Sequence, residues 1–309
     1  MLAIGLDIAK GKLDFYCAGK HCEIKNHPKS IKEHFKSIDR QSRIVLESTG
    51  KHHRATHRVL ERMGFSVMVV NPYQSKHFAM ALKLNYKTDK ADAKMLSIFA
   101  EKMDFKPTPC ASKLQQSMQD LSRHLDDLKK VRLDLNARTK DSTGFIKRSL
   151  GKAVKAIDKE IKAAEEKLSE AIDKDDTLQK SLQLLMSIPG VGETTAVSLL
   201  SYLKELGSVN KRQIAALSGL APMNNDSGKF EGKRRIKGGR HDVRSHLYMP
   251  VLGAATQHNK RLNSFYVRLV KSGKPKKVAL TACMRKLITW ANAIIATGEP
   301  WDNKYANNH

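Results

Sequence analysis

The chain has 309 residues, and its 56 Lys and Arg against 31 Asp and Glu give a formal net charge of +25. An excess of this size favours a polyanionic partner, either nucleic acid or a membrane surface. No run of about 18 apolar residues occurs, the first residues lack the pattern of a signal peptide, and four cysteines do not make a disulfide scaffold in so long a chain. We therefore expect a cytoplasmic, soluble, nucleic-acid-binding protein with no membrane partner.

Residues 1–108 are predicted to form an α/β domain. Strand-like runs occur at MLAIGLDIA, KLDFYCA, RIVLE and FSVMVVNP, and helical patterns follow from about His52 to Met63 and through TDKADAKMLSIFAEKM. This order predicts a mixed sheet with helices on its faces. The two prolines of KPTPC, residues 106–110, mark the end of the domain, because they cannot continue the preceding helix.

Residues 109–177 are predicted to form a helical arm. The stretch from Ser112 to about Lys174 is highly charged and nearly free of Gly and Pro. Its apolar residues recur at spacings of three and four, which predicts two long amphipathic helices in an antiparallel hairpin or coiled coil, with the turn near 142–151. Arms of this kind commonly dimerise. The apolar positions are Leu114, Met118, Leu121, Leu125 and Leu128, then Ile157, Ile161, Ala164, Leu168 and Ile172.

Residues 178–309 are predicted to form a third, mostly helical domain. The sequence LLMSIPGVGETTAVSLLSYL indicates a helix, a tight turn and a second helix, as in a helix-hairpin-helix element. Gly190 and Gly192 in the turn would let backbone N–H groups approach a nucleic-acid phosphate without interference from side chains. An ordinary helical hairpin in a protein core is the alternative.

A basic, Gly-rich segment follows in the same domain. Such clusters neutralise phosphates and make binding salt-dependent. A charge run is usually a solvated face, but a second stretch, 258–286, is also basic and contains no acid, which favours a surface for the nucleic-acid backbone. The candidate binding residues are Lys229, Lys233, Arg234, Arg235, Lys237, Arg240 and Arg244.

Four carboxylates carry the strongest chemical signal. Asp7 lies within one apolar run and Glu47 ends another, where a charge is costly to bury unless it is paired or bound to a cation. Asp89 and Asp92 are spaced i, i+3, so a helix places both on one face. Four such carboxylates could hold Mg²⁺, which prefers oxygen ligands. The alternative is that the two aspartates are solvated helix charges and that Glu47 caps the following helix.

The motifs GLDIAK, LESTG, VNP and KTDKADA, in this order, resemble those of the DEDD transposases of the IS110 insertion-sequence family, whose relatives include the Piv-type DNA invertases. The resemblance implies a RuvC-like domain of RNase H-like fold. It also implies that Asp7, Glu47, Asp89 and Asp92 are catalytic and bind Mg²⁺. A small departure is Ser48, which stands where Ala is common.

The C-terminal segment resembles the transposase domain of the same family, in its pattern AP…SG…G…I-GG…R..LY. This resemblance makes Ser227, in Asp226-Ser227-Gly228, a catalytic nucleophile that attacks a DNA phosphate and holds the strand as a phosphoserine. On the residues alone Ser227 is more typical of a turn. Ser245 and Tyr248 are rival hydroxyls in the same segment.

The resemblance implies a transposase or site-specific recombinase of bacterial or archaeal origin, associated with the nucleoid. It further implies homodimers that pair as a tetramer on donor and target DNA, guided by a structured bridge RNA. Two other functions stay open. One is a metal-dependent endonuclease of the Holliday-junction type, with no covalent intermediate. The other is a nucleic-acid-binding protein without catalysis.

Overall fold

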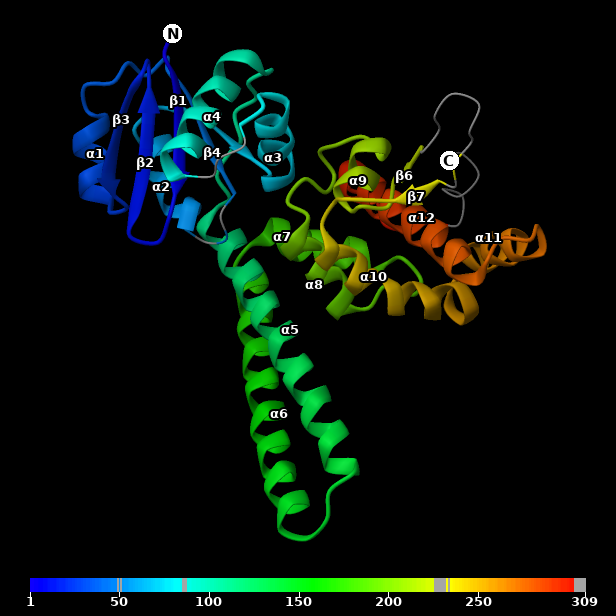
Figure 1. The fold of residues 1–309 in the computed structure, drawn as a ribbon. Coiled ribbons are helices and arrows are strands. Elements are labelled where there is room, and N and C mark those ends of the chain that lie inside the picture. The colour runs from blue at the N-terminus through cyan, green and yellow to red at the C-terminus, as the bar shows by residue number, and fades with distance from the viewer. Residues whose placement is uncertain (49, 51, 85–87, 225–231, 233, 303–309) are drawn as a thin grey trace. The chain divides into compact units, whose positions relative to one another are not determined.

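The computed structural model describes residues 1–309 except 49, 51, 85–87, 225–231, 233 and 303–309. The chain divides into two compact units, Met1–Ala111 and Ser112–His309. Figure 1 colours the first unit from blue to cyan and the second from green to red. The two predicted helices of the arm belong to the second unit.

The first unit is built on a mixed sheet, as the sequence predicted, but with five strands rather than four, in the order β3-β2-β1-β4-β5. The chain forms two antiparallel pairs, β1 with β2 and β2 with β3, and then adds β4 and β5 parallel to β1. β3 was not predicted, because KHCEIK carries mostly polar residues at the sheet edge. The strands are β1 (Ala3–Ile8), β2 (Lys12–Cys17), β3 (Lys20–Lys25), β4 (Arg43–Glu47) and β5 (Ser66–Val70).

Helices cover both faces of this sheet (Figure 1). Because successive strand residues point to opposite faces, Leu6 and Leu46 pack in a core with α1 and α2, whereas Val45 packs on the other face with α4. Asp7 and Glu47 follow Leu6 and Leu46 and so share the face of α4. The helices are α1 (Pro28–Phe35), α2 (His52–Arg62), α3 (Pro72–Ala81) and α4 (Asp89–Lys102).

α4 lies directly on β1 because of Gly5. A Cβ atom at this position would overlap the carbonyl oxygen of Ala93 in α4. The Ser97 hydroxyl donates a 2.9 Å hydrogen bond to the carbonyl oxygen of Ala3, which fixes the register of helix and strand. The Thr88 side chain caps the helix by accepting from the N–H of Ala91 at 3.2 Å. The first turn of α4 is therefore held beside the end of β1.

Substitution of Gly5 by Ala is expected to destabilise the first unit by about 1–3 kcal/mol, because the methyl group must push α4 away from β1. Denaturant unfolding monitored by circular dichroism measures the loss. Gly11→Ala is the matched control, since an added Cβ there meets no atom within 4 Å. Equal stabilities of the two variants would contradict the close contact.

Two long helices begin the second unit, as predicted: α5 (Lys113–Lys140) and α6 (Gly144–Asp173). The turn is shorter than expected, because α6 already begins at Gly144 and therefore contains Gly151. Gly144 has a φ of +56°, a conformation that glycine adopts without the Cβ penalty. The predicted apolar stripe forms the contact between the helices; its buried members are Met118, Leu125, Ile161, Ala164, Leu168 and Ile172.

The remaining helices pack with the base of this arm in one continuous core, whereas the residues of the short strands β6 and β7 are exposed. α12 is the one described helix long and apolar enough to cross a membrane, but more than half of that stretch is buried, and Leu287, Ile288 and Trp290 lie in the core. The elements are α7 (Asp176–Met186), α8 (Glu193–Tyr202), α9 (Lys211–Leu217), β6 (Pro222–Met223), β7 (Arg235–Ile236), α10 (His241–Gly253), the π-helical turn η1 (Ala254–His258), α11 (Lys260–Lys271) and α12 (Lys276–Thr297).

Candidate active site

The first unit brings the four predicted carboxylates together. Asp7 lies near the carboxyl end of β1 and Glu47 ends β4, and these strands are parallel neighbours in which Leu6 is paired with Leu46. Asp89 and Asp92 lie in the first turn of α4, which is packed on β1. All four side chains are close enough for the other three charges to act on Asp7.

The electrostatics of Asp7 reflect this crowding. Burial, followed by the negative charges of Asp92 and Asp89 and, more weakly, Glu47, raises the pKa of Asp7 to about 6. A hydrogen bond from the backbone of Ile8 acts in the opposite direction but is outweighed. Four mutually repelling carboxylates fit a divalent cation, which would relieve the repulsion and is bound by oxygen ligands.

Two residues that the sequence did not reveal position these carboxylates. Ser75 in α3, only 1% exposed, donates a 2.6 Å hydrogen bond from its hydroxyl to Oε2 of Glu47. Lys12 in β2 forms an ion pair with Asp89, with Nζ 3.0 Å from Oδ2, and also contacts Glu23 and Asp14. The carboxylates of Glu23 and Asp89 raise the pKa of Lys12, so it is cationic at the site. Neither residue stands in a motif, and only the pairing of the strands and helices shows its role.

The predicted helix-hairpin-helix element corresponds to α7, the turn 187–192 and α8. Its two glycines differ in environment. A Cβ at Gly190, whose φ is +93°, would overlap Ala254, so this glycine is required for packing. Gly192 is exposed, caps α8 and has open space around it. Gly192 is therefore the accessible glycine of the turn, although Glu193 beside it is acidic.

The basic candidates fall into two groups. Arg240 donates to both carboxylate oxygens of Glu205, at 2.6 and 2.7 Å, and to the carbonyl oxygen of Tyr202 at 2.8 Å. Arg244 donates to the carbonyl oxygen of Gly238. These two arginines thus hold the loop before α10. The exposed group consists of Arg234, Arg235 and Lys237.

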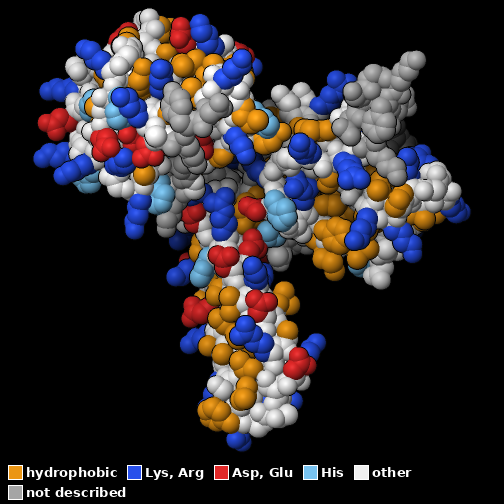
Figure 2. All heavy atoms as spheres, in the orientation of Figure 1, with side chains coloured by type: hydrophobic (Ala, Val, Ile, Leu, Met, Phe, Trp, Pro, Cys, Tyr) orange, Lys and Arg blue, Asp and Glu red, His pale blue; other side chains and the backbone are white. Residues whose placement is uncertain are grey.

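Lys229, Lys233 and the predicted nucleophile Ser227 lie outside the described residues. In the sequence, all three fall between β6 and β7, which pair antiparallel, with Pro222 opposite Ile236. Figure 2 shows Lys and Arg side chains spread over the visible face of both units rather than gathered in a single patch.

The rival hydroxyls lie on α10. The Ser245 Oγ is 3.3 Å from Nδ1 of His241, and Tyr248 is exposed. At the next residue, Nε2 of His246 lies 2.8 Å from Oδ1 of Asp126 in α5, and the Tyr202 hydroxyl donates to Oδ2 of Asp126 at 2.9 Å. Ser245 is thus beside a possible base, which makes it a useful control for Ser227.

A carboxylate cluster at the ends of two parallel strands offers oxygen ligands for divalent cations. Comparison with known proteins gives the family. Residues 4–142 match a family model for IS110-type DEDD proteins, described as "Transposase", and residues 182–267 match one described as "Transposase IS116/IS110/IS902 family". Together the matches cover well over half of the chain, which belongs to the IS110 family of transposases.

Two curated relatives extend this similarity over nearly the whole chain. They are pilin gene-inverting proteins of Moraxella bovis and Moraxella lacunata. Each is 25% identical over 317 aligned positions, which cover 97% of this chain and 98% of the relative. The resemblance to DEDD transposases and Piv-type invertases that the sequence motifs indicated is therefore confirmed.

Asp7→Asn is expected to stabilise the metal-free protein by on the order of 1 kcal/mol at pH 8, allowing for solvent screening of a partly exposed group. An aspartate whose pKa is raised by folding costs stability only when ionised. The gain should therefore be absent below about pH 4, grow as the pH rises, and be complete above about pH 6. Urea unfolding with a chelator from pH 4 to 8 measures it.

Glu33→Gln in α1 is the control for this experiment, because Glu33 is an exposed carboxylate of the same unit. It should show no such pH-dependent gain. A loss of stability in Asp7→Asn at pH 8 would show that repulsion does not dominate the site.

Proposed function

We propose that the chain is a transposase or site-specific recombinase that cuts and rejoins DNA through an Mg²⁺-binding tetrad and a serine nucleophile. The tetrad consists of Asp7, Glu47, Asp89 and Asp92, in a RuvC-like domain of RNase H-like fold. The observation that carries the proposal is the convergence of these carboxylates on one face of the sheet, where together with burial they raise the pKa of Asp7 to about 6.

Each residue of the proposed site has a separate role. The four carboxylates bind the cation, Ser75 orients Glu47 and Lys12 restrains Asp89. When bound there, Mg²⁺ would polarise the scissile phosphate and the attacking oxygen. The motif similarity supports Ser227 as the nucleophile.

The covalent step is a transesterification. The Oγ–P bond to Ser227 forms as the bond between phosphorus and a deoxyribose oxygen breaks. The serine proton is given up and the released deoxyribose oxygen takes up a proton, so that no external oxidant or reductant is needed. A free DNA hydroxyl then attacks the phosphoserine and reverses the step, which joins a new pair of strands.

Binding of the polyanionic substrate is assigned to the second unit. Gly192 at the start of α8 and the side chains of Arg234, Arg235 and Lys237 are exposed, as phosphate contacts require. Together with Gly190, Arg240 and Arg244, which shape the surrounding turn and loop, they form the proposed surface for donor and target DNA. The net charge of +25 also accommodates the bridge RNA that the family resemblance implies. The named activity of the relatives supports DNA inversion as a second form of the same chemistry.

A covalent-trapping assay tests the proposal. The protein is incubated with Mg²⁺, the flanking DNA and the RNA of its element, then denatured and separated by gel electrophoresis. The wild type and the matched control Ser245→Ala should give a protein–DNA adduct. Ser227→Ala and Asp7→Asn should give none, while Ser227→Ala keeps its DNA affinity.

The outcomes separate the alternative functions. Mg²⁺-dependent cleavage without any adduct would indicate the junction endonuclease. An adduct that persists in Ser227→Ala and disappears in Ser245→Ala would move the nucleophile to α10. Specific DNA binding that is unchanged in Asp7→Asn, with no cleavage under any condition, would indicate a binding protein.

The arm is proposed to form the homodimer that pairs into a tetramer. Its outer surface carries large exposed apolar side chains, which are unusual on a solvated helix and mark protein contacts. They are Val131, Leu133, Phe145 and Ile146, of which Phe145 is 77% exposed. Figure 2 shows hydrophobic side chains along the arm and at its tip.

The double substitution Leu133→Glu and Phe145→Glu is therefore expected to weaken self-association by at least about tenfold, because it places charges in an apolar contact. Light scattering coupled to gel filtration measures the mass across a concentration series. Val278→Glu serves as the control, since Val278 is a 53% exposed apolar residue of α12, outside the two helices of the arm. A wild-type mass profile for the double variant would exclude this surface as the dimer contact.

A further inference from the structure

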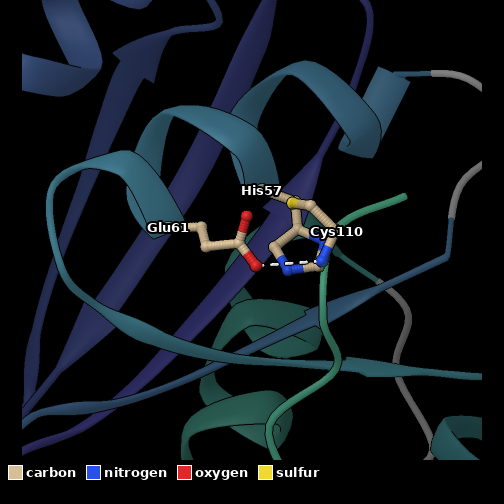
Figure 3. Close-up of side chains that lie close together, drawn as sticks. All are labelled: His57, Glu61 and Cys110. Atoms are coloured by element: carbon tan, nitrogen blue, oxygen red, sulfur yellow. Dashed lines mark hydrogen bonds between the residues drawn. The ribbon is translucent and has the colours of Figure 1, made fainter. Parts of the chain in front are cut away.

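Away from the tetrad, three side chains of different chemistry meet in the first unit. His57 and Glu61 lie one turn apart on α2, and Cys110 lies near the end of the unit. One ligand atom from each, an imidazole nitrogen, a carboxylate oxygen and the thiol sulfur, lies within 4.8 Å of the other two. Figure 3 shows the three side chains converging between α2 and the segment that carries Cys110. α2 packs on the face of the sheet opposite α4, so this cluster is separate from the tetrad.

The sequence KPTPC explains how Cys110 is held in place. Prolines at 107 and 109 have no N–H group and favour extended backbone in the residue before them. In residues 107–110 the backbone N–H groups are therefore those of 108 and 110, and both donate hydrogen bonds. The N–H of Thr108 donates to the carbonyl oxygen of Val67 in β5 at 2.8 Å, and the N–H of Val69 donates to the Thr108 hydroxyl at 3.0 Å.

The second donor ties Cys110 to α2. Its N–H donates a 2.9 Å hydrogen bond to Oε1 of Glu61, shown as a dashed line in Figure 3. A carboxylate has two oxygens and several lone pairs, so one such group can accept a hydrogen bond and also bind a cation. His57 is only 6% exposed, which restricts its side-chain orientations. The arrangement is therefore preorganised by the strand edge, the helix and the prolines rather than by chance proximity of mobile side chains.

We propose that His57, Glu61 and Cys110 form a zinc site. Imidazole nitrogen, carboxylate oxygen and thiolate sulfur are the three ligand types of Zn²⁺, and three protein ligands leave a fourth position for water. The thiolate selects against Mg²⁺ and Ca²⁺, which are hard cations with oxygen ligands. Binding releases the thiol proton of Cys110 to solvent and requires neutral His57. The bound ion would attach the C-terminal segment of the first unit to α2. This unit ends at Ala111.

Cobalt is the probe, because Co²⁺ takes similar ligands and a thiolate-to-cobalt charge-transfer band reports sulfur coordination. The full chain is titrated with Co²⁺ in excess Mg²⁺, which competes for all-oxygen sites but not for a thiolate. The wild type should bind one equivalent with this band. Zn²⁺ should then abolish the band and raise the melting temperature, and a chelator should reverse that rise.

Cys110→Ser should lose the band and the thermal shift. The matched control is Cys22→Ser, since Cys22 lies in the same unit with its sulfur 3.9 Å from Nε2 of His34 but outside the cluster. It should keep both signals. Glu61→Gln, at an exposed position, should remain folded by circular dichroism and bind Co²⁺ at least about tenfold more weakly, as expected on loss of a ligand. Absence of the band in the wild type, or its survival in Cys110→Ser, overturns the proposal.

Discussion

Repulsion among four carboxylates is the constraint on which the architecture of the first unit depends. The fold must hold Asp7 and Glu47 at adjacent strand ends and place the start of α4 over them. This is possible because Gly5 has no side chain, so α4 can pack directly on β1. The apolar core beneath α4 offsets the electrostatic cost, since each large side chain buried there contributes about 1.5–3 kcal/mol; its buried members are Val45, Val70, Met95, Leu96, Phe99 and Ala100.

The parts of this fold that follow a period or a motif could be predicted from the sequence. The arm followed from apolar spacing, and the tetrad followed from the order of four short motifs. The positioning residues could not be found in this way, because Lys12 and Ser75 act through contacts set by strand register and helix packing. The cluster around Cys110 was hidden for the same reason, since Cys110 lies 49 residues after Glu61 and meets α2 only because residues 106–110 run beside β5.

The charge excess was a good guide to the class of partner and a poor guide to individual contacts. The sequence predicted that Arg240 binds phosphate. In the structure its guanidinium instead forms a bidentate ion pair with the carboxylate of Glu205. The positive charge of Arg240 lowers the pKa of Glu205 against the opposing effect of burial, so the pair is ionised. A basic residue can thus serve binding indirectly, by fixing the loop that presents its exposed neighbours.

Within the second unit, a polar network connects the arm with α10. Burial alone would raise the pKa of Asp126, but the hydrogen bonds from His246 and Tyr202 and the charge of His246 lower it. The same bond to Asp126 raises the pKa of His246. The pair is therefore charged between the two pKa values: its stabilisation fades as the pH rises through that of His246 or falls through that of Asp126.

Because Asp126 lies on α5, Tyr202 on α8 and His246 on α10, movement of the arm against α10 requires these bonds to break. The pair is partly buried, with the Asp126 side chain 39% exposed, so these charge-assisted hydrogen bonds oppose that movement without excluding it. A contact made along the arm therefore also constrains the orientation of α10, the helix that follows the proposed phosphate-binding loop.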